Sequence, residues 1–349
     1  MELGLSNGIF NSYIQTMLIE FITQPGFNFL ITFAEALNVD VINNEIQIPT
    51  SLGEGFVRRV DIYEDFRLHI HRYRLNQELI LKRVGAKELA SFISVILYNN
   101  DEPLSLLTAD EGQRNFSRYN DMAIQVATNN FDSIITFPAD TEVYYTVIGI
   151  STARLKALLE LSRPDALIDA IVTPKESILF FESMGPETQK TLKQISASQS
   201  ENGFSGFYYR LKAETLLYDV FNQLHNRQLI KHSPVNKADA EKLFQIREAI
   251  LTNLSQPPSL PALAKLGGIS ETKMKDLFRQ VFGDSIYNYY QTARMEEAAY
   301  LLRHKNYSVS EAGYRLGFSN LSHFTRLFER HHQQKPKKYA SGGLDYFSG

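Results

Sequence analysis

The sequence contains no cysteine and no tryptophan among its 349 residues. Without cysteine, the chain has no disulfide framework, no cysteine-ligated zinc site and no thiol nucleophile. No window reaches the roughly 18 unbroken apolar residues that a transmembrane helix needs. The first basic residue is Arg58, so the beginning of the sequence lacks the basic segment of a secretory signal. These absences predict a cytoplasmic protein with no membrane partner.

What is present is the composition of a folded, globular chain, with 44% hydrophobic and 21% charged residues. The chain is longer than a single hydrophobic core usually supports, which predicts two domains. The net charge of −3 is unevenly distributed: residues 237–349 carry 16 basic and 11 acidic side chains, and residues 1–236 carry 20 and 28. A basic end on an acidic chain points weakly to a polyanionic partner.

The N-terminal part changes its hydrophobic period along its length. Residues 1–40 are expected to begin as a helix, because apolar side chains recur at helical spacing before Gln24-Pro25-Gly26 stops it. From about residue 44 to 150, short β-branched and aromatic segments alternate with turn residues, which predicts an antiparallel barrel or sandwich. The helical positions are Ile14, Met17, Leu18 and Phe21, and the strand segments are 45–48, 56–63, 67–74, 91–98 and 142–150.

Helical spacing returns at Thr152 and again over residues 208–224. The second stripe either packs against the β-domain or forms the seam of a homodimer. The predicted fold class is therefore α+β. We expect an N-terminal domain over 1–231 (β-rich at 44–150, helical at 151–231), a linker at 232–237, and an all-α domain over 238–349.

An internal repeat is the most informative feature of the basic end. Gly268-Ile269-Ser270 recurs 49 residues later as Gly317-Phe318-Ser319, and Met274-x-x-Leu277-Phe278 recurs 50 residues later as Phe324-x-x-Leu327-Phe328. Each copy predicts a short helix, a turn at its glycine, and a second helix with the apolar residues facing inward. Ser259 and Ser308 are expected N-caps, and Ser308-x-x-Glu311 is a capping box. Two such helix-turn-helix units, separated by one continuous helix over 285–303, predict a domain that binds successive major grooves of DNA.

This part of the sequence resembles the AraC/XylS family of bacterial transcription regulators over about 100 residues. The resemblance implies a seven-helix, two-lobed DNA-binding domain that activates, or less often represses, promoters, with double-stranded DNA and RNA polymerase as partners. Gly313, Gln333 and Asp276 depart from the usual family residues. The matching positions are Leu263-Ala264, Gly268-Ile269-Ser270, Leu277-Phe278-Arg279, Gly283-x-Ser285, Tyr289, Arg294-Met295-x-x-Ala298-x-x-Leu301-Leu302, Val309-x-Glu311, Gly317-Phe318-Ser319, His323-Phe324-x-Arg326-x-Phe328 and Pro336-x-x-Tyr339.

Carried over by position, the resemblance assigns base contacts to the second helix of each unit. Arg326 is the strongest candidate, because a bidentate arginine–guanine pair is the commonest specific contact; a phosphate contact is the alternative. Asp276 cannot bind guanine or phosphate, although an aspartate can accept a hydrogen bond from cytosine N4. The base-contact candidates are Thr272, Lys275, Asp276, Leu321, Ser322, Thr325 and Arg326, and the backbone candidates are Lys273, Arg279, Lys335, Lys337 and Lys338.

No catalytic motif is found in the N-terminal domain, and no cofactor is expected. His69 and His71 share one face of a strand, but the incomplete ligand set argues against a metal site. In this family the first domain is often a cupin-like sensor for a small molecule, so the resemblance implies a sensor and dimerisation domain over 1–231. The segments 55–59, 68–74 and 208–214 weakly resemble the siderophore-sensing branch of the family. This implies a small-molecule effector, for which Arg58, Arg59, Arg72 and Arg74 are either anchors or surface charges; the effector-binding residues stay unassigned.

These observations predict a dimeric transcription regulator, more often an activator than a repressor in its family, that is not an enzyme. Two other classes remain open from sequence alone. One is a metal-dependent cupin enzyme with a regulatory helical domain, and the other is a protein-interaction scaffold. The inducer, the operator and the dimer geometry are not determined by the sequence.

Overall fold

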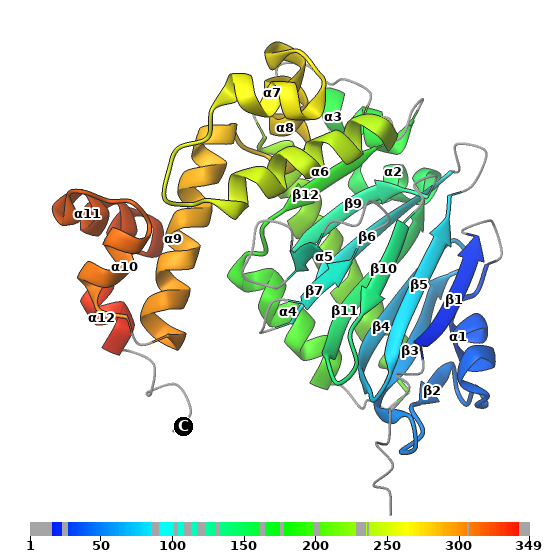
Figure 1. The fold of residues 1–349 in the computed structure, drawn as a ribbon. Coiled ribbons are helices and arrows are strands. Elements are labelled where there is room, and N and C mark those ends of the chain that lie inside the picture. Colours follow the sequence, from blue (N-terminus) through cyan, green and yellow to red (C-terminus); the bar gives the residue numbers. More distant parts are fainter. Residues whose placement is uncertain are drawn as a thin grey trace, which may run out of the picture.

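The computed structural model describes residues 16–22, 27–85, 91–100, 104–107, 113–116, 123–129, 133–160, 165–174, 178–197, 203–227, 235, 237–305 and 307–341. Two β-sheets and their flanking helices form the N-terminal part, and helices alone form the C-terminal part (Figure 1). The predicted α+β architecture is confirmed. None of the helices in the described segments is long and apolar enough to cross a lipid bilayer.

The larger sheet has seven strands in the order β12-β9-β6-β11-β4-β3-β2, and each adjacent pair in it is antiparallel. The smaller sheet has five strands in the order β1-β5-β10-β7-β8. The strands of the larger sheet are β2 (Glu45–Gln47), β3 (Gly53–Tyr63), β4 (Phe66–Leu75), β6 (Phe92–Tyr98), β9 (Ile124–Thr128), β11 (Glu142–Ser151) and β12 (Leu179–Glu182). Those of the smaller sheet are β1 (Thr16–Ile22), β5 (Glu78–Val84), β7 (Leu104–Leu107), β8 (Gln113–Phe116) and β10 (Ser133–Phe137).

The expected helix near the start of the chain is wrong where the structure describes it. Residues 16–22 form strand β1, which pairs in parallel with β5 so that Ile19 lies opposite Leu81. Seven residues are too few to separate helical from strand spacing, and the edge of β5 offers this backbone hydrogen-bond partners. Ile14 and the Gln24-Pro25-Gly26 stop lie outside the described residues. The parallel pair also departs from the expected all-antiparallel sheets, and β1 and β12 both lie outside the range 44–150.

The larger sheet separates two layers of apolar packing. On β4, Leu68 and Ile70 belong to the cluster that includes the flanking helices, whereas Tyr73 belongs to the cluster between the two sheets. This alternation follows from the two-residue period of a strand. The helices of the first cluster are α2 (Thr152–Leu159), α3 (Ala166–Val172), α4 (Pro186–Ala197) and α5 (Ser205–His225), whereas α1 (Phe29–Leu37) packs in the cluster between the sheets.

Helix α5 packs its apolar stripe against the sheet. Leu217, Val220 and Leu224 are buried with sheet residues in one cluster. Of the two alternatives for this stripe, internal packing is therefore confirmed for its buried face. Leu211, which the sequence placed in the same stripe, is instead 47% exposed.

The C-terminal helices form two compact units joined by one long helix. The first unit contains α7 (Leu260–Gly267) and α8 (Glu271–Phe282), and α6 (Lys237–Thr252) packs against both. Helix α9 (Ile286–His304) leads to α10 (Val309–Arg315), α11 (Leu321–His332) and α12 (Pro336–Ser341). The predicted linker at 232–237 falls mostly outside the described residues, although Val235 is described and buried.

The two units differ in how they are attached. The buried residues of the first unit, such as Phe278, belong to the same apolar cluster as the interior of the two sheets. The second unit has a separate core around Phe324 and Phe328. In Figure 1, α10–α12 stand apart from the sheets, with α9 as the connection, whereas α6–α8 lie beside β12.

The two repeat glycines occupy left-handed backbone at the predicted turns. Gly268 has a φ of 59° and nothing within 4 Å of the position of an added Cβ. Gly317 has a φ of 78°, and an added Cβ would lie 1.9 Å from the carbonyl oxygen of Ser255. Gly317 therefore meets two constraints, backbone conformation and close approach, whereas Gly268 meets only the first.

We predict that Gly317→Ala lowers the free energy of unfolding by about 3 kcal/mol, because the left-handed conformation and the steric clash add. Gly268→Ala is the matched control, and it should cost only about 1 kcal/mol. Urea denaturation of both variants, followed by far-UV circular dichroism, measures the difference. Equal losses in the two variants would contradict the assigned role of the Ser255 contact.

Candidate nucleic-acid interface and its connection to the sheets

Side-chain caps fix where each recognition helix begins. The Ser270 hydroxyl accepts a hydrogen bond from the Lys273 amide at the start of α8, and Asn320 Oδ1 accepts from the Ser322 and His323 amides at the start of α11. The capping box predicted at Ser308 is present at the start of α10. Ser259 occupies the N-cap of α7 but makes no side-chain cap bond. The caps satisfy backbone donors that would otherwise lack partners.

Helix α8 presents the predicted polar face outward. Met274, Leu277 and Phe278 are buried, as the repeat predicted. The three base-contact candidates of this unit, Thr272, Lys275 and Asp276, are exposed. The exposed face is therefore available to an external partner.

Helix α11 has the same arrangement in the second unit. Phe324 and Phe328 are fully buried, and Leu327 is half-buried. Of the base-contact candidates, Ser322 and Arg326 are exposed and Leu321 and Thr325 are half-buried. The spacing of the repeat thus predicted correctly which residues face inward on both helices.

The charges of α8 are partly neutralised within the protein. The Lys273 ammonium lies 2.9 Å from Asp239 Oδ1 on α6, and the Lys275 ammonium lies 3.3 Å from Glu271 Oε2. The remaining backbone-contact candidates, Arg279, Lys335, Lys337 and Lys338, are exposed. Lys273 is accordingly the least available of the predicted phosphate contacts.

Arg294 joins the long helix α9 to the turn of the second unit. Its guanidinium donates a hydrogen bond of 2.7 Å to the Leu316 carbonyl and lies 3.8 Å from the centroid of the Phe318 ring. Cation–π attraction to the ring thus acts together with a buried hydrogen bond. The contact fixes the direction of α9 relative to α10 and α11.

Known proteins match this part of the chain. A helix-turn-helix domain family matches residues 263–342, which include both units. Among curated relatives, GlxA of Rhizobium meliloti, an HTH-type transcriptional regulator, is 32% identical over 94 residues, 27% of this chain and 29% of GlxA. RhaR of Cronobacter sakazakii, an HTH-type transcriptional activator, is 29% identical over 118 residues, 34% of this chain and 42% of RhaR. The chain thus spans less than half the length of these relatives.

The C-terminal part of this chain is similar to proteins of the AraC/XylS family. A solved structure of a probable AraC family transcriptional regulator from Rhodopseudomonas palustris is 28% identical, and the match covers 29% of this chain and 96% of that one with a TM-score of 0.27. The helix-turn-helix match and the curated relatives confirm the family resemblance predicted from the sequence.

Two departures from the usual AraC/XylS residues have structural explanations. Gln333 adopts the left-handed backbone (φ 55°) that a glycine would adopt without strain, and its side-chain amide donates to the Arg330 carbonyl. At Gly313, an added Cβ would lie 2.7 Å from the Leu321 side chain. The space that alanine would occupy is therefore filled by the first residue of α11.

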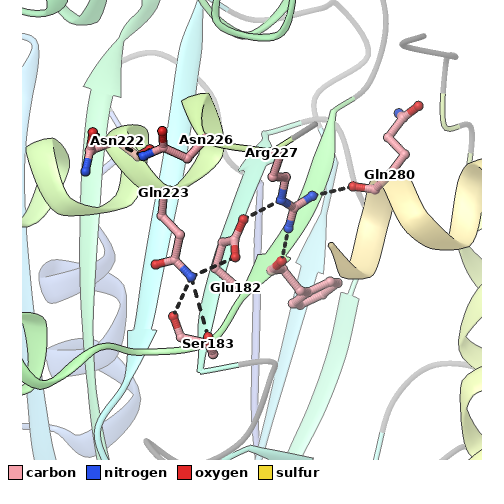
Figure 2. Close-up of polar contacts among 8 residues, drawn as sticks. Glu182, Ser183, Asn222, Gln223, Asn226, Arg227 and Gln280 are labelled. Carbon is pink, nitrogen blue, oxygen red and sulfur yellow. Dashed lines mark hydrogen bonds and ion pairs between the residues drawn. The ribbon is translucent and has the colours of Figure 1, made fainter. Parts of the chain in front are cut away.

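The C-terminal end of α8 is held by an arginine that the sequence analysis did not single out. Arg227, just beyond α5, donates to the Glu182 carboxylate and the Phe181 carbonyl of β12, and to the Gln280 carbonyl in the last turn of α8 (Figure 2). Gln223 donates to the other Glu182 oxygen at 2.8 Å. A cation at a helix C-terminus satisfies unpaired carbonyls and opposes the negative end of the helix dipole.

The ion pair between Arg227 and Glu182 is almost completely buried. The side chains of Arg227 and Glu182 are 6% and 10% exposed. Burial lowers the pKa of Arg227 and raises that of Glu182, and in each case the opposite charge of the partner acts against this shift. Removing either charge would leave the other buried and uncompensated.

Aromatic rings surround the same junction. Phe181 of β12 lies 5.6 Å from Phe244 of α6 and 5.9 Å from Phe282 of α8, measured between ring centroids. The first helix-turn-helix unit is therefore attached to the larger sheet by apolar packing as well as by Arg227.

A cavity of about 210 Å³ lies between the two sheets. His69 and His71 both line it, which confirms that the two imidazoles share a face. Burial lowers the pKa of His69 to about 3 and that of His71 well below its usual value, so both rings are neutral near pH 7. Arg67 and Arg83 are the arginines that line the cavity.

The four arginines considered earlier as effector anchors lie elsewhere. Arg58 pairs with Glu45 and donates to the Tyr209 hydroxyl, and Arg59 pairs with Asp61. Arg72 lies over the Tyr144 ring, and the Arg74 guanidinium is 3.9 Å from Glu54. These contacts match the interpretation of the four arginines as surface charges, not as effector anchors.

One cluster outside the cavity has the side-chain types of a metal site. Glu296 on α9 and His331 and His332 on α11 have potential ligand atoms within 4.8 Å of one another. His331 Nδ1 lies 3.5 Å from Glu296 Oε1, and His332 Nε2 lies 3.0 Å from the Met295 carbonyl oxygen. These contacts link α9 to the end of α11 without requiring an ion.

We predict that Glu182→Gln lowers the free energy of unfolding by about 3 kcal/mol, because it leaves the Arg227 guanidinium buried without its counter-ion. Hydrogen–deuterium exchange should become faster in β12 and in the last turn of α8, but not in α11. Glu214→Gln, which removes an exposed ion pair with Arg210, is the matched control and should change neither property measurably. Unchanged exchange at α8 in Glu182→Gln would contradict the connection.

Proposed function

We propose that this protein is a sequence-specific transcription regulator that binds double-stranded DNA in the cytoplasm and inserts α8 and α11 into successive major grooves. The observation that carries the proposal is the pair of recognition helices, each with its apolar face buried and its polar face exposed. Helix α9, with 19 residues, is about 28 Å long, comparable with the roughly 34 Å that separates successive major grooves.

The second unit supplies the stronger base contacts in this proposal. Arg326 is exposed on α11 and can reach O6 and N7 of guanine, while Ser322, Thr325 and Leu321 contact neighbouring base edges. In the first unit, Thr272, Lys275 and Asp276 have the same roles. Arg279, Lys335, Lys337 and Lys338 contact phosphates, and Lys273 does so only if it leaves Asp239.

Activation of transcription, with RNA polymerase as a partner, is the proposed outcome of DNA binding. Two of the curated relatives, RhaR and RhaS, are named transcriptional activators. The curated relatives described above are regulators, which supports a regulator over an enzyme for this chain.

Control by a small molecule is proposed through the cavity between the sheets. One apolar cluster contains cavity-lining residues such as Tyr145 and Phe137, then Phe181, and then Phe278 and Phe282 of α8. A ligand acts on DNA binding only if it stabilises one arrangement of the first unit over another. The Arg227 contact and this cluster provide the physical connection by which occupancy of the cavity affects α8.

A homodimer is proposed through the outer face of α5. Phe207, Leu211 and Tyr218 are 59%, 47% and 66% exposed. Their spacing of four and seven residues places them along one side of the helix, as in the seam of a two-stranded coiled coil. This face replaces the buried stripe as the dimer seam.

We predict that Arg326→Ala abolishes preference for the operator and leaves weak nonspecific binding, because a bidentate arginine–guanine contact contributes roughly 1–3 kcal/mol to discrimination. The operator is first selected from random duplexes, and fluorescence anisotropy then compares it with a scrambled duplex. Lys190→Ala removes the same charge at an exposed position of α4, outside both helix-turn-helix units, and serves as the control. Retention of operator preference by Arg326→Ala would show that α11 does not read the bases.

We predict that Leu211→Glu converts a dimer into a monomer, because it places a charge in the apolar seam. Sedimentation velocity at micromolar concentration measures the change. Leu158→Glu introduces the same side chain at another exposed position, 37% exposed on α2, and should leave the dimer intact. A monomeric wild-type protein, or a dimeric Leu211→Glu variant, would refute the proposed seam.

A further inference from the structure

Three side chains with metal-binding groups meet where the end of α11 lies against α9. Glu296 is on α9, and His331 and His332 are the last two residues of α11. One potential ligand atom of each residue lies within 4.8 Å of those of the other two. Two imidazoles and a carboxylate, supplied by two helices, therefore surround one small region of the second helix-turn-helix unit.

The distance between two of these groups is that between two ligands of one ion. His331 Nδ1 lies 3.5 Å from Glu296 Oε1. A charge-assisted hydrogen bond between such groups would be about 2.8 Å long. Two ligand atoms at about 2.1 Å from a tetrahedral zinc ion lie about 3.4 Å from each other. The pair is therefore too far apart for a strong hydrogen bond, and its spacing fits a shared ion.

His332 is held in place on two sides. Its ring centroid lies 4.4 Å from that of Phe328 and 5.1 Å from that of Tyr339. Its Nε2 lies 3.0 Å from the Met295 carbonyl oxygen, which can only accept, so Nε2 donates and Nδ1 has the free lone pair. A metal-bound imidazole commonly donates its other N–H to a backbone carbonyl in this way.

The types of ligand decide which ions fit. Mg²⁺ and Ca²⁺ prefer oxygen ligands, whereas imidazoles suit zinc and its neighbours in the first transition row. Partial burial lowers the pKa of both histidines, so near pH 7 their rings are neutral, the form that binds a metal. The side chains of His331 and Glu296 are 29% and 38% exposed, so an ion can enter from solvent.

We propose that Glu296, His331 and His332 bind one divalent transition-metal ion, with Zn²⁺ as the reference ion and water as the fourth ligand. The bound ion joins α9 to the end of α11 and thereby fixes the second recognition helix on the long helix that supports it. This site is separate from the cavity between the sheets, and it does not depend on the proposed function.

The first experiment measures metal binding by the full-length protein without an affinity tag, after treatment with a chelator and desalting. We expect calorimetric titration with ZnCl₂ to show one ion per chain and titration with MgCl₂ to show none. Co²⁺ should give the visible absorption of a four-coordinate ion. Because the sequence has no cysteine, thiolate ligands cannot produce either signal. Zn²⁺ should also slow hydrogen–deuterium exchange in the last turn of α11, but not in α8.

Glu296→Gln and His331→Gln test the ligands, because each leaves a three-ligand site with only two. Each variant should bind Zn²⁺ roughly tenfold or more weakly and lose the Co²⁺ absorption. Glu329→Gln and His323→Gln, at exposed positions of α11 outside the cluster, are the matched controls and should bind Zn²⁺ like the wild type. Circular dichroism of the metal-free variants checks their folding, and if one ligand variant does not fold, the other decides.

Three results would overturn the site. They are absence of zinc binding by the wild type, one ion per two chains, and zinc binding that is unchanged in Glu296→Gln and His331→Gln. The last result would place the ion elsewhere, for example at His69 and His71. None of these measurements uses DNA, so failure of the metal site leaves the proposed DNA-binding function standing.

Discussion

The buried guanidinium of Arg227 is the constraint on which the arrangement of the two domains depends. It joins the end of α5 to Glu182 on β12 and to the last turn of α8. A charge this far from solvent is stable only while all of its partners stay in place. The position of α8 is therefore coupled to β12 at the edge of the larger sheet. A displacement of either element would break the contacts of Arg227 with the other.

The two helix-turn-helix units are alike in sequence but not in attachment. The first shares an apolar cluster with the sheets, whereas the second has its own core and is oriented by Arg294 through α9. In the proposed regulator, α11 keeps a fixed position relative to α9, while the N-terminal part of the chain can bias the position of α8. The partial neutralisation of the α8 lysines is consistent with this division, because it makes the first unit the weaker contact.

Strand β4 contributes to an apolar core on one face and to the cavity on the other. Its even-numbered residues Leu68 and Ile70 pack under the helices, and its odd-numbered residues Arg67, His69 and His71 line the cavity. The two-residue period thus lets one strand stabilise the domain on one face and supply polar groups on the other. The pKa values of the histidines are lowered because the same burial that forms the cavity excludes water from it.

The sequence by itself determined the C-terminal domain, because its signals are local. Caps, turn glycines and helical spacing lie within a few residues of the groups they organise, and the repeat at 268 and 317 showed them twice. Strand β1, the Arg227 contact and the position of Arg67 could not be predicted, because each depends on residues distant in sequence: β1 on the edge of β5, Arg227 on Glu182 and Gln280, and Arg67 on the Phe27 carbonyl. Only the tertiary structure brings such groups together, since their interaction energies exist only after the intervening chain has folded.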